Sequence, residues 1–176
     1  MFSNPQSNVD KFGLMPGLAI ADIGSGTGEY SFAIARAVGN EGKVYAVDVQ
    51  KDLLTHLKQL ADAEGLGNIE ILWANAEKPR GTGIADRSLA GVVLANVLFQ
   101  IEEKEGFAKE VARILRSKGR IFIIDWKESF GGLGPQSSNI VSPSDAEALF
   151  VPHGCVKITE FDAGDNHYGL ILEKNI

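Results

Sequence analysis

An apolar segment that runs directly into three closely spaced glycines constrains the fold of this chain more than any other feature. Residues 18–23 form a short apolar run, and Gly24, Gly26 and Gly28 follow at every second position before a helix is expected near Glu29. Glycine permits positive φ and close approach of the backbone to a ligand, and the free N–H groups at a helix start favour a carboxylate or phosphate. The segment therefore predicts a strand, a ligand-binding turn and a helix in succession.

Short apolar runs alternate with stretches of helical periodicity along most of the chain. This alternation is typical of βαβ units around a parallel sheet, which is a doubly wound α/β fold. The last two expected strands are joined by residues 162–167, which suffice for a hairpin but not for a crossover helix, so the sheet should end in an antiparallel strand. The expected strands cover residues 18–23, 43–49, 68–73, 89–94, 120–126, 156–161 and 168–173.

Capping signals mark the ends of several expected helices. Ser142, Pro143 and Asp145 have the order of an N-cap, a first-turn proline and an acidic partner, which predicts a last helix reaching Phe150. Residues 131–138 are rich in glycine and serine and predict a mobile loop after the fifth strand. The expected C-terminal caps are Gly39, Gly65 and Gly119.

Length, charge and cysteine content exclude several classes of protein. The 176 residues are expected to form a single domain spanning residues 1–176. A net charge of -6 without a basic cluster argues against nucleic acid as substrate. No apolar run reaches the ~18 to 20 residues of a membrane span, and the start of the chain lacks a signal-peptide pattern, so a cytoplasmic location is expected. One cysteine, three scattered histidines and no carboxylate cluster predict no metal site.

Asp48 strengthens the interpretation of the glycine turn. It ends the second expected strand 20 residues after Gly28, about where doubly wound folds present an acid to ribose hydroxyls. Taken alone, an aspartate at a strand end is more often a helix cap, and a tight turn needs glycine for packing alone. Dinucleotide-binding turns space their glycines as G-x-G-x-x-G, whereas here Glu29 takes the place of the third glycine. The spacing disfavours NAD.

The segment from Asp22 to Gly28 meets the pattern D-x-G-x-G-x-G in full. In this the chain resembles the class I S-adenosylmethionine-dependent methyltransferases, over roughly residues 18 to 174. Through residues 73–77, 94–98 and 111–125 it is similar to the small-molecule enzymes of the ubiquinone/menaquinone biosynthesis type, the type 11 group. The resemblance implies a Rossmann-like sheet of seven strands in the order 3-2-1-4-5-7-6, with strand seven antiparallel.

The resemblance also implies S-adenosylmethionine as cofactor and a set of contacts to it. The methionine part is expected on Asp22 and the glycine turn, the ribose on Asp48, and the adenine against Val49 and Ala76. Asn75 stands where relatives usually have aspartate, and its carbonyl can accept the same hydrogen bond from the adenine amine. The cofactor-binding residues expected in this way are Asp22, Gly24, Ser25, Gly26, Asp48, Val49, Asn75, Ala76, Glu77 and Asn96.

The function implied is methyl transfer to a small-molecule acceptor by in-line displacement, in a crevice at the carboxyl ends of the strands. Asn96 should lie nearest the methyl group, with Phe99, Asp125 and Trp126 forming the wall beyond it. Asp125 and His167 are the candidate bases if the acceptor must lose a proton. The alternative is a non-catalytic S-adenosylmethionine-binding subunit that acts through a protein partner. The sequence leaves open the acceptor, the atom methylated and whether the protein forms a homodimer.

Overall fold

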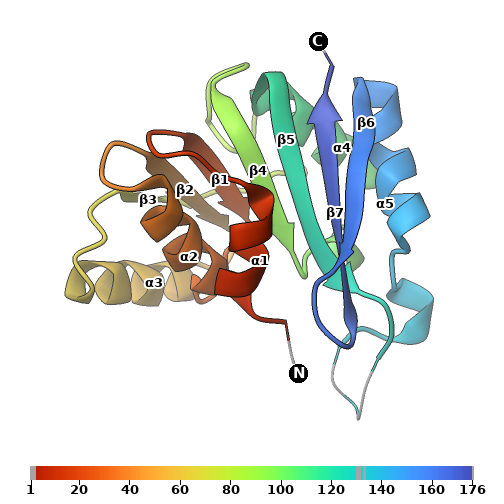
Figure 1. The fold of residues 1–176 in the computed structure, drawn as a ribbon, viewed down its shortest axis with the longest axis horizontal. Helices are drawn as coiled ribbons and strands as arrows, with labels where there is room; N and C mark the ends of the chain where they lie inside the picture. Colours follow the sequence, from red (N-terminus) through yellow and green to blue (C-terminus); the bar gives the residue numbers. More distant parts are fainter. Residues whose placement is uncertain (1–2, 130–131, 133, 176) are drawn as a thin grey trace.

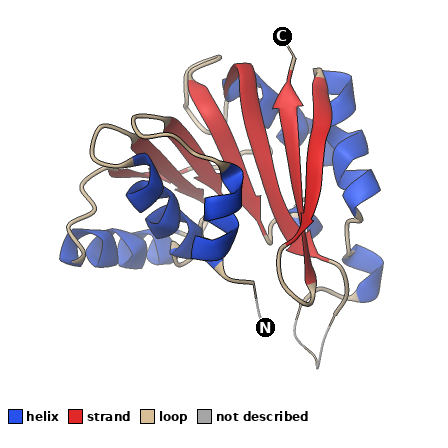
Figure 2. Cartoon of the chain, viewed as in Figure 1, coloured by secondary structure: helices blue, strands red, loops and turns tan. Residues whose placement is uncertain are grey.

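Seven strands form one mixed sheet with helices on both faces (Figures 1 and 2). The computed structural model describes residues 3–129, 132 and 134–175. The strand order is β3-β2-β1-β4-β5-β7-β6. Neighbours from β3 to β5 pair in parallel, whereas β7 is antiparallel to both β5 and β6. The expected doubly wound fold, its strand order and its antiparallel seventh strand are confirmed.

All seven expected strands are present. The strands are β1 (Ala19–Ile23), β2 (Lys43–Asp48), β3 (Ile69–Trp73), β4 (Leu89–Ala95), β5 (Leu115–Trp126), β6 (Cys155–Asp162) and β7 (His167–Lys174). The α-helices are α1 (Pro5–Phe12), α2 (Glu29–Val38), α3 (Lys51–Ala63), α4 (Lys104–Ile114) and α5 (Pro143–Phe150). The described residues also contain three 3-10 turns, namely η1 (Leu98–Gln100), η2 (Ser137–Asn139) and η3 (Val151–His153).

The expected cap at Gly119 is wrong. Helix α4 ends at Ile114 and the chain passes directly into β5. The register between β4 and β5 then jumps from the pair Leu89–Leu115 to the pair Gly91–Arg120, so residues 116–119 bulge out of the ladder. Gly119 therefore lies within the irregular start of β5. A bulge of this kind adds residues to one strand only, which the apolar pattern does not reveal.

Helix α1 was not expected, although it carries the same kind of signals as the last helix. The Asn4 side chain accepts a hydrogen bond from Ser7 N, Pro5 occupies the first turn, and Gly13 follows the helix at a φ of 64°. At α5 the expected N-cap is confirmed, because the Ser142 side chain accepts from Asp145 N. The sequence thus held enough information to place α1.

Two apolar layers cover the faces of the sheet. Helices α1, α2 and α3 contribute to one layer, and α4 and α5 contribute to the other. The connection from β3 to β4, residues 74–88, contains no helix. Because the carboxyl ends of parallel strands meet at one rim, the turns after β1, β2, β3 and β4 come together there. Within the described residues no helix is long and apolar enough to cross a membrane.

Candidate functional site

The three glycines after β1 meet different surroundings. Their φ angles are all positive, at 77° for Gly24, 52° for Gly26 and 93° for Gly28. A Cβ atom on Gly24 would lie 2.7 Å from the side chain of Val97, and one on Gly28 would lie 2.6 Å from Leu57, whereas one on Gly26 would meet nothing within 4 Å. Packing therefore requires glycine at both ends of the turn, while the middle glycine faces open space that a ligand can occupy.

Asp48 is held against this turn by two backbone donors. Its Oδ2 accepts from Gly26 N at 2.9 Å and its Oδ1 accepts from Gln50 N at 2.8 Å. The side chain is buried, with 8% of its surface exposed. A carboxylate has about four acceptor positions, so each oxygen keeps the capacity to accept a further bond from a ligand hydroxyl. Asp48 is thus fixed in place before any ligand binds.

A cavity of about 240 Å³ lies beside Asp48 at the carboxyl ends of β1, β2 and β3. Seven of the ten expected cofactor residues line it, namely Gly24, Gly26, Asp48, Val49, Asn75, Ala76 and Glu77. Asp22, Ser25 and Asn96 do not. The opposite wall, made by Val97, Gln100, Ile101 and Phe107, was not expected. Val97, Gln100 and Ile101 follow Asn96 closely in the sequence, which was the available signal, whereas Phe107 lies on α4.

A second and more open groove of about 770 Å³ adjoins the first cavity, and the two share Gln100 and Ile101. Phe99, which the sequence analysis expected in the wall on the acceptor side, lines this groove. Its far side is formed by residues 138–141 with Asp145 and Leu149. The groove therefore joins the end of β4 to the start of α5.

Hydrogen bonds within the loop after β3 fix the walls of the first cavity. Asn75 Oδ1 accepts from Glu77 N at 2.8 Å. Glu77 Oε2 in turn accepts from Glu102 N at 3.0 Å and from Glu103 N at 2.7 Å. The Glu77 carboxylate thereby ties the loop after β3 to the segment that carries Gln100. These two hydrogen bonds indicate that Glu77 holds two walls of the cavity together.

A buried carboxylate anchors the rest of this helix-free connection. Glu110 on α4 is 2% exposed and accepts from Arg80 N, Thr82 N and Thr82 Oγ1 at 3.1, 3.1 and 2.6 Å. It also forms an ion pair with Arg113. Burial alone would raise the pKa of Glu110, but the bonds from Arg113 and Thr82 outweigh it and lower the pKa. Glu110 is therefore a charged anchor for the loop that carries Asn75 to Glu77.

Asp22 lies beneath the glycine turn and is 1% exposed. Its Oδ2 accepts from Ser31 Oγ of α2 at 2.6 Å. Burial raises the pKa of this carboxyl to about 6 despite that bond. Nearby, the buried Ser25 Oγ has no protein partner in the described part of the chain. A cation placed at the turn would compensate the buried charge of Asp22.

Asn96, at the end of β4, has an unusual backbone conformation. Its φ is 56°, in the left-handed region that few non-glycine residues adopt. Its carbonyl oxygen accepts from Gln100 Nε2 at 2.9 Å. Its side-chain Oδ1 is buried and pairs with no other described residue. Strain and an unpaired acceptor at one residue are typical of functional positions.

Asp125 and His167 lie at the same rim but on opposite faces of the sheet. Asp125 is paired with Tyr168 across the β5–β7 ladder and Trp126 is paired with His167, and successive side chains alternate between faces. The two candidate bases therefore do not face a common point. Neither of them lines the cavity beside Asp48.

The two candidate bases also differ in their hydrogen bonding. Asp125 Oδ2 accepts from Leu98 N at 3.0 Å and Oδ1 accepts from Trp126 N at 2.8 Å, and burial raises its pKa to about 6. His167 is 3% exposed, and both of its ring nitrogens lack a partner among the described residues. Its ring lies 4.3 Å from that of Trp126, and burial lowers its pKa. Asp125 thus holds the backbone after Asn96, whereas His167 keeps its nitrogens free.

The loop expected after β5 folds over this region. Gly134 lies against the ring of Trp126, because a Cβ atom there would approach the indole to 2.8 Å. Residues 130, 131 and 133 of the same loop lie outside the described residues. In the ranges that the structure describes, no group of three or more histidine, cysteine, aspartate or glutamate side chains could hold a metal ion.

Comparison with known proteins gives concordant matches. The family model described as "Methyltransferase domain" matches residues 14–161. The "Ubiquinone/menaquinone biosynthesis C-methyltransferase UbiE" of Hahella chejuensis is 32% identical over 121 residues, 68% of this chain and 47% of that protein. The protein of the same name from Erwinia tasmaniensis is 24% identical over 161 residues, 91% of this chain and 61% of that protein. This chain thus spans about half to three fifths of the length of these curated relatives.

A solved structure covers almost all of the chain. The structure described as a SAM-dependent methyltransferase from Aquifex aeolicus superposes with a TM-score of 0.88 and is 25% identical. The match covers 98% of this chain and 90% of that one. The two chains therefore share their fold over almost the whole length of this chain.

Proposed function

The chain belongs to the methyltransferase domain family, whose cofactor is S-adenosylmethionine, and from this premise we propose that it methylates a small-molecule acceptor at the rim formed by β4, β5 and β7. The observation that carries the proposal is the pre-positioned Asp48 carboxylate between the open face of Gly26 and an apolar cavity. This arrangement suits a nucleoside, because one end offers acceptors for ribose hydroxyls and the other offers apolar walls for a base.

The residues present fit the cofactor. Asp48 would accept from the ribose hydroxyls, and Val49 and Ala76 would contact the adenine. The cavity is smaller than the ~300 to 1,000 Å³ of sites for drug-sized ligands, which suits the adenosine half of the cofactor. The methionine half would extend along the glycine turn, where the buried Asp22 carboxylate compensates its ammonium group and Ser25 Oγ gains a partner.

The bound cofactor supplies a sulfonium-linked methyl group, so the protein must chiefly orient the acceptor and exclude water. We assign the orienting role to Asn96, whose Oδ1 is buried and unpaired at the end of β4. If the acceptor must lose a proton, His167 is the better base of the two candidates, because burial keeps its imidazole neutral and both nitrogens lack partners. Asp125 positions the backbone of Leu98 instead.

The acceptor class is the finer part of the proposal. The curated relatives are named as C-methyltransferases of ubiquinone and menaquinone biosynthesis. A ring carbon of a quinol-like molecule is therefore the first acceptor that we propose to test. Phe99 in the adjoining groove and Trp126 at the end of β5 offer aromatic surfaces that suit such a ring.

The proposal is tested by binding and turnover of the purified chain. Calorimetry with S-adenosylhomocysteine should show one site per chain, and methyl-labelled S-adenosylmethionine should label quinol-like molecules or another component of a small-molecule extract. Absence of binding would contradict the whole proposal. The second candidate is a cofactor-binding subunit that needs a partner, favoured by the finding that Asn96 and His167 do not line the cavity beside Asp48. It predicts binding without turnover by the isolated chain.

A further inference from the structure

The outer edge of β3 carries unpaired backbone groups. β3 pairs only with β2, at one end of the sheet. Val44 N donates to Asn68 O at 2.9 Å, and Ala74 N donates to Asp48 O at 3.1 Å. Because alternate residues of a strand in a parallel ladder bond to the same side, the backbones of Ile69, Ile71 and Trp73 all point outward from the sheet. Such an edge is a template for another strand.

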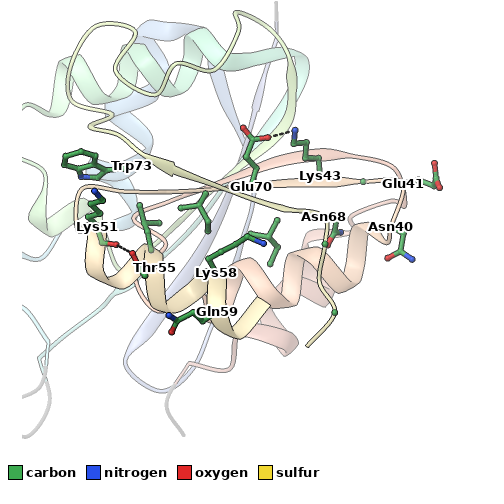
Figure 3. A pocket seen from close by; sticks show the side chains of 16 residues that line it. Asn40, Glu41, Lys43, Lys51, Thr55, Lys58, Gln59, Asn68, Glu70 and Trp73 are labelled. Atoms are coloured by element: carbon green, nitrogen blue, oxygen red, sulfur yellow. Dashed lines mark hydrogen bonds and ion pairs between the residues drawn. The ribbon is translucent and has the colours of Figure 1, made fainter. Parts of the chain in front are cut away.

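An open groove of about 1210 Å³ runs along this edge, between β3 and α3 (Figure 3). Leu54, Ile69 and Ile71 contribute apolar lining. Trp73 stands at one end of the groove with 66% of its surface exposed. Its Nε1 donates to Val49 O at 3.0 Å, so the ring is held in place although it is exposed. A fixed, exposed indole beside an open edge is a feature of protein interfaces.

Charges around the groove are arranged in a self-complementary way. Lys43 is paired with Glu70, and Lys58 with Asp62. Neither Lys51 nor Glu41 of the lining forms an ion pair with any described residue, and the Lys51 ammonium group lies 5.2 Å from the centroid of the Trp73 ring. Figure 3 shows Lys51 beside Trp73 at one end of the groove and Glu41 at the opposite end. A two-fold axis through the middle of the groove would bring Lys51 of one molecule near Glu41 of a second molecule, and Glu41 of the first near Lys51 of the second.

We propose that the β3 edge and its groove form a symmetric interface with a second copy of this chain. The two β3 strands pair antiparallel about a two-fold axis at Ile71. In that register Ile71 faces Ile71 of the second copy and Ile69 faces Trp73 of the second copy, so all outward-pointing backbone groups of β3 are satisfied. Each Trp73 ring then packs beside the other copy's Ile69, and Lys51 approaches the other copy's Glu41.

The opposite edge of the sheet is unsuited to the same contact. The ladder between β6 and β7 shifts register between Lys157 and Thr159, which leaves Ile158 as a bulged residue. Lys157 forms ion pairs with Glu147 and Glu160 on this edge. Bulges and edge charges are devices that prevent strand addition. β3 has neither an internal bulge nor an unpaired charge along its five residues.

Charge reversal tests the axis and the register. Sedimentation velocity over a concentration series should show a monomer–dimer equilibrium for the wild type. Lys51→Glu or Glu41→Lys alone should weaken dimerisation at least tenfold, because each places like charges at both ends of the interface. The double variant K51E/E41K should return to within about threefold of the wild type. Lys109→Glu, an exposed change of equal charge on α4, should have no effect. A monomeric wild type at all concentrations, or a double variant as weak as the singles, would overturn the proposal.

A cross-link tests the contact at the axis. Residues opposite each other in a hydrogen-bonded antiparallel pair have Cα atoms about 5.5 Å apart, within the range of ~4.4 to 6.8 Å that a disulfide spans. Ile71→Cys should therefore yield a reducible covalent dimer under mild oxidation. Ile158→Cys on β6 should not, and the wild type should not, because its single cysteine, Cys155, is buried. Equal cross-linking of both variants would contradict the assignment to β3.

Discussion

The two ends of the functional rim are built differently. At the end formed by β1, β2 and β3, Asp48 and Glu77 each accept two backbone hydrogen bonds, and the cavity between them has its shape without a ligand. At the end formed by β4, β5 and β7, Asn96 Oδ1 and both nitrogens of His167 are buried without partners. The carboxylates at the first end have their hydrogen-bond partners within the protein, whereas the second end contains buried polar atoms without a partner among the described residues.

This difference indicates which buried polar groups form their hydrogen bonds within the protein and which are left for a ligand. Each unpaired buried polar group costs roughly 1 to 3 kcal/mol, so a chain keeps such groups where something other than the protein pairs them. The end that contains Asp48 has one such unpaired buried atom among the described residues, Ser25 Oγ, which we place beside the methionine half of the cofactor. The end that contains Asn96 and His167 has three, namely Asn96 Oδ1 and the two ring nitrogens of His167. We therefore expect substitutions at the first end to change cofactor affinity, and substitutions at the second to change turnover.

The largest effect is expected from Asp48→Ala. Each hydrogen bond between a charged carboxylate and a ribose hydroxyl contributes ~1.5 to 3 kcal/mol, and the variant also frees Gly26 N and Gln50 N. S-adenosylhomocysteine binding should weaken between about tenfold and a hundredfold in calorimetry. Circular dichroism provides the folding control. An unchanged affinity in a folded variant would remove Asp48 from the site.

Asp22→Asn should raise the stability of the fold while it weakens cofactor binding. The pKa of Asp22 is about 6 in the folded chain and near 3.8 when unfolded, so the native state binds more protons between pH 4 and 6 and loses stability as the pH rises through that window. The neutral variant avoids this loss. It should exceed the wild type in free energy of unfolding by about 3 kcal/mol at pH 8, since each pKa unit is worth about 1.4 kcal/mol, and match it near pH 4, while binding S-adenosylhomocysteine more weakly.

Denaturant titrations of the two proteins at several pH values measure this effect. Asp125, whose pKa is also about 6, titrates equally in both proteins and cancels in the difference. A difference between variant and wild type that does not depend on pH would mean that the Asp22 carboxyl does not carry the buried charge.

Asn96→Ala and His167→Ala should act on the other end of the rim. Each should lower turnover about tenfold while cofactor affinity stays within about threefold, because the residues act on the acceptor or its orientation. If His167 is the base, the wild-type rate should fall as pH drops through its lowered pKa, below 6.5, and the variant should lose that dependence. If these variants lost cofactor affinity and turnover to the same extent, the proposed division of roles between the two ends would be contradicted.

The smallest effect is expected from chelation. Sulfonium chemistry needs no Lewis acid, and neither end of the rim presents a cluster of ligands in the described residues. Activity in EDTA should equal activity without it. Loss of activity that a divalent ion restores would show a metal requirement at either end.

The sequence was sufficient for the fold and for the floor of the cavity, because both rest on local signals. Strand and helix periodicity predicted the elements and the doubly wound class, the family resemblance implied the strand order, and the glycine turn with Asp48 lies at predictable strand ends. The wall was not predicted because Val97, Gln100 and Ile101 lie in a segment without strand or helix periodicity, and because the periodicity of α4 does not show that Phe107 reaches the cavity. The opposed directions of Asp125 and His167 depend on the register of the β5–β7 ladder, and a shift of one residue would reverse them. Such pairing is decided by tertiary packing.

The two tryptophans of the chain lie at opposite ends of the rim. Trp73 is hydrogen-bonded to the backbone of Val49, which lines the cavity beside Asp48, and the ring of Trp126 lies against that of His167. Each end therefore carries its own native fluorophore. In Trp126→Phe the remaining emission comes from Trp73, whose ring is bonded to the backbone of Val49, and in Trp73→Phe it comes from Trp126, where a protonated His167 imidazole would quench the neighbouring indole. The two single-tryptophan variants therefore give each end of the rim its own optical signal, without a label.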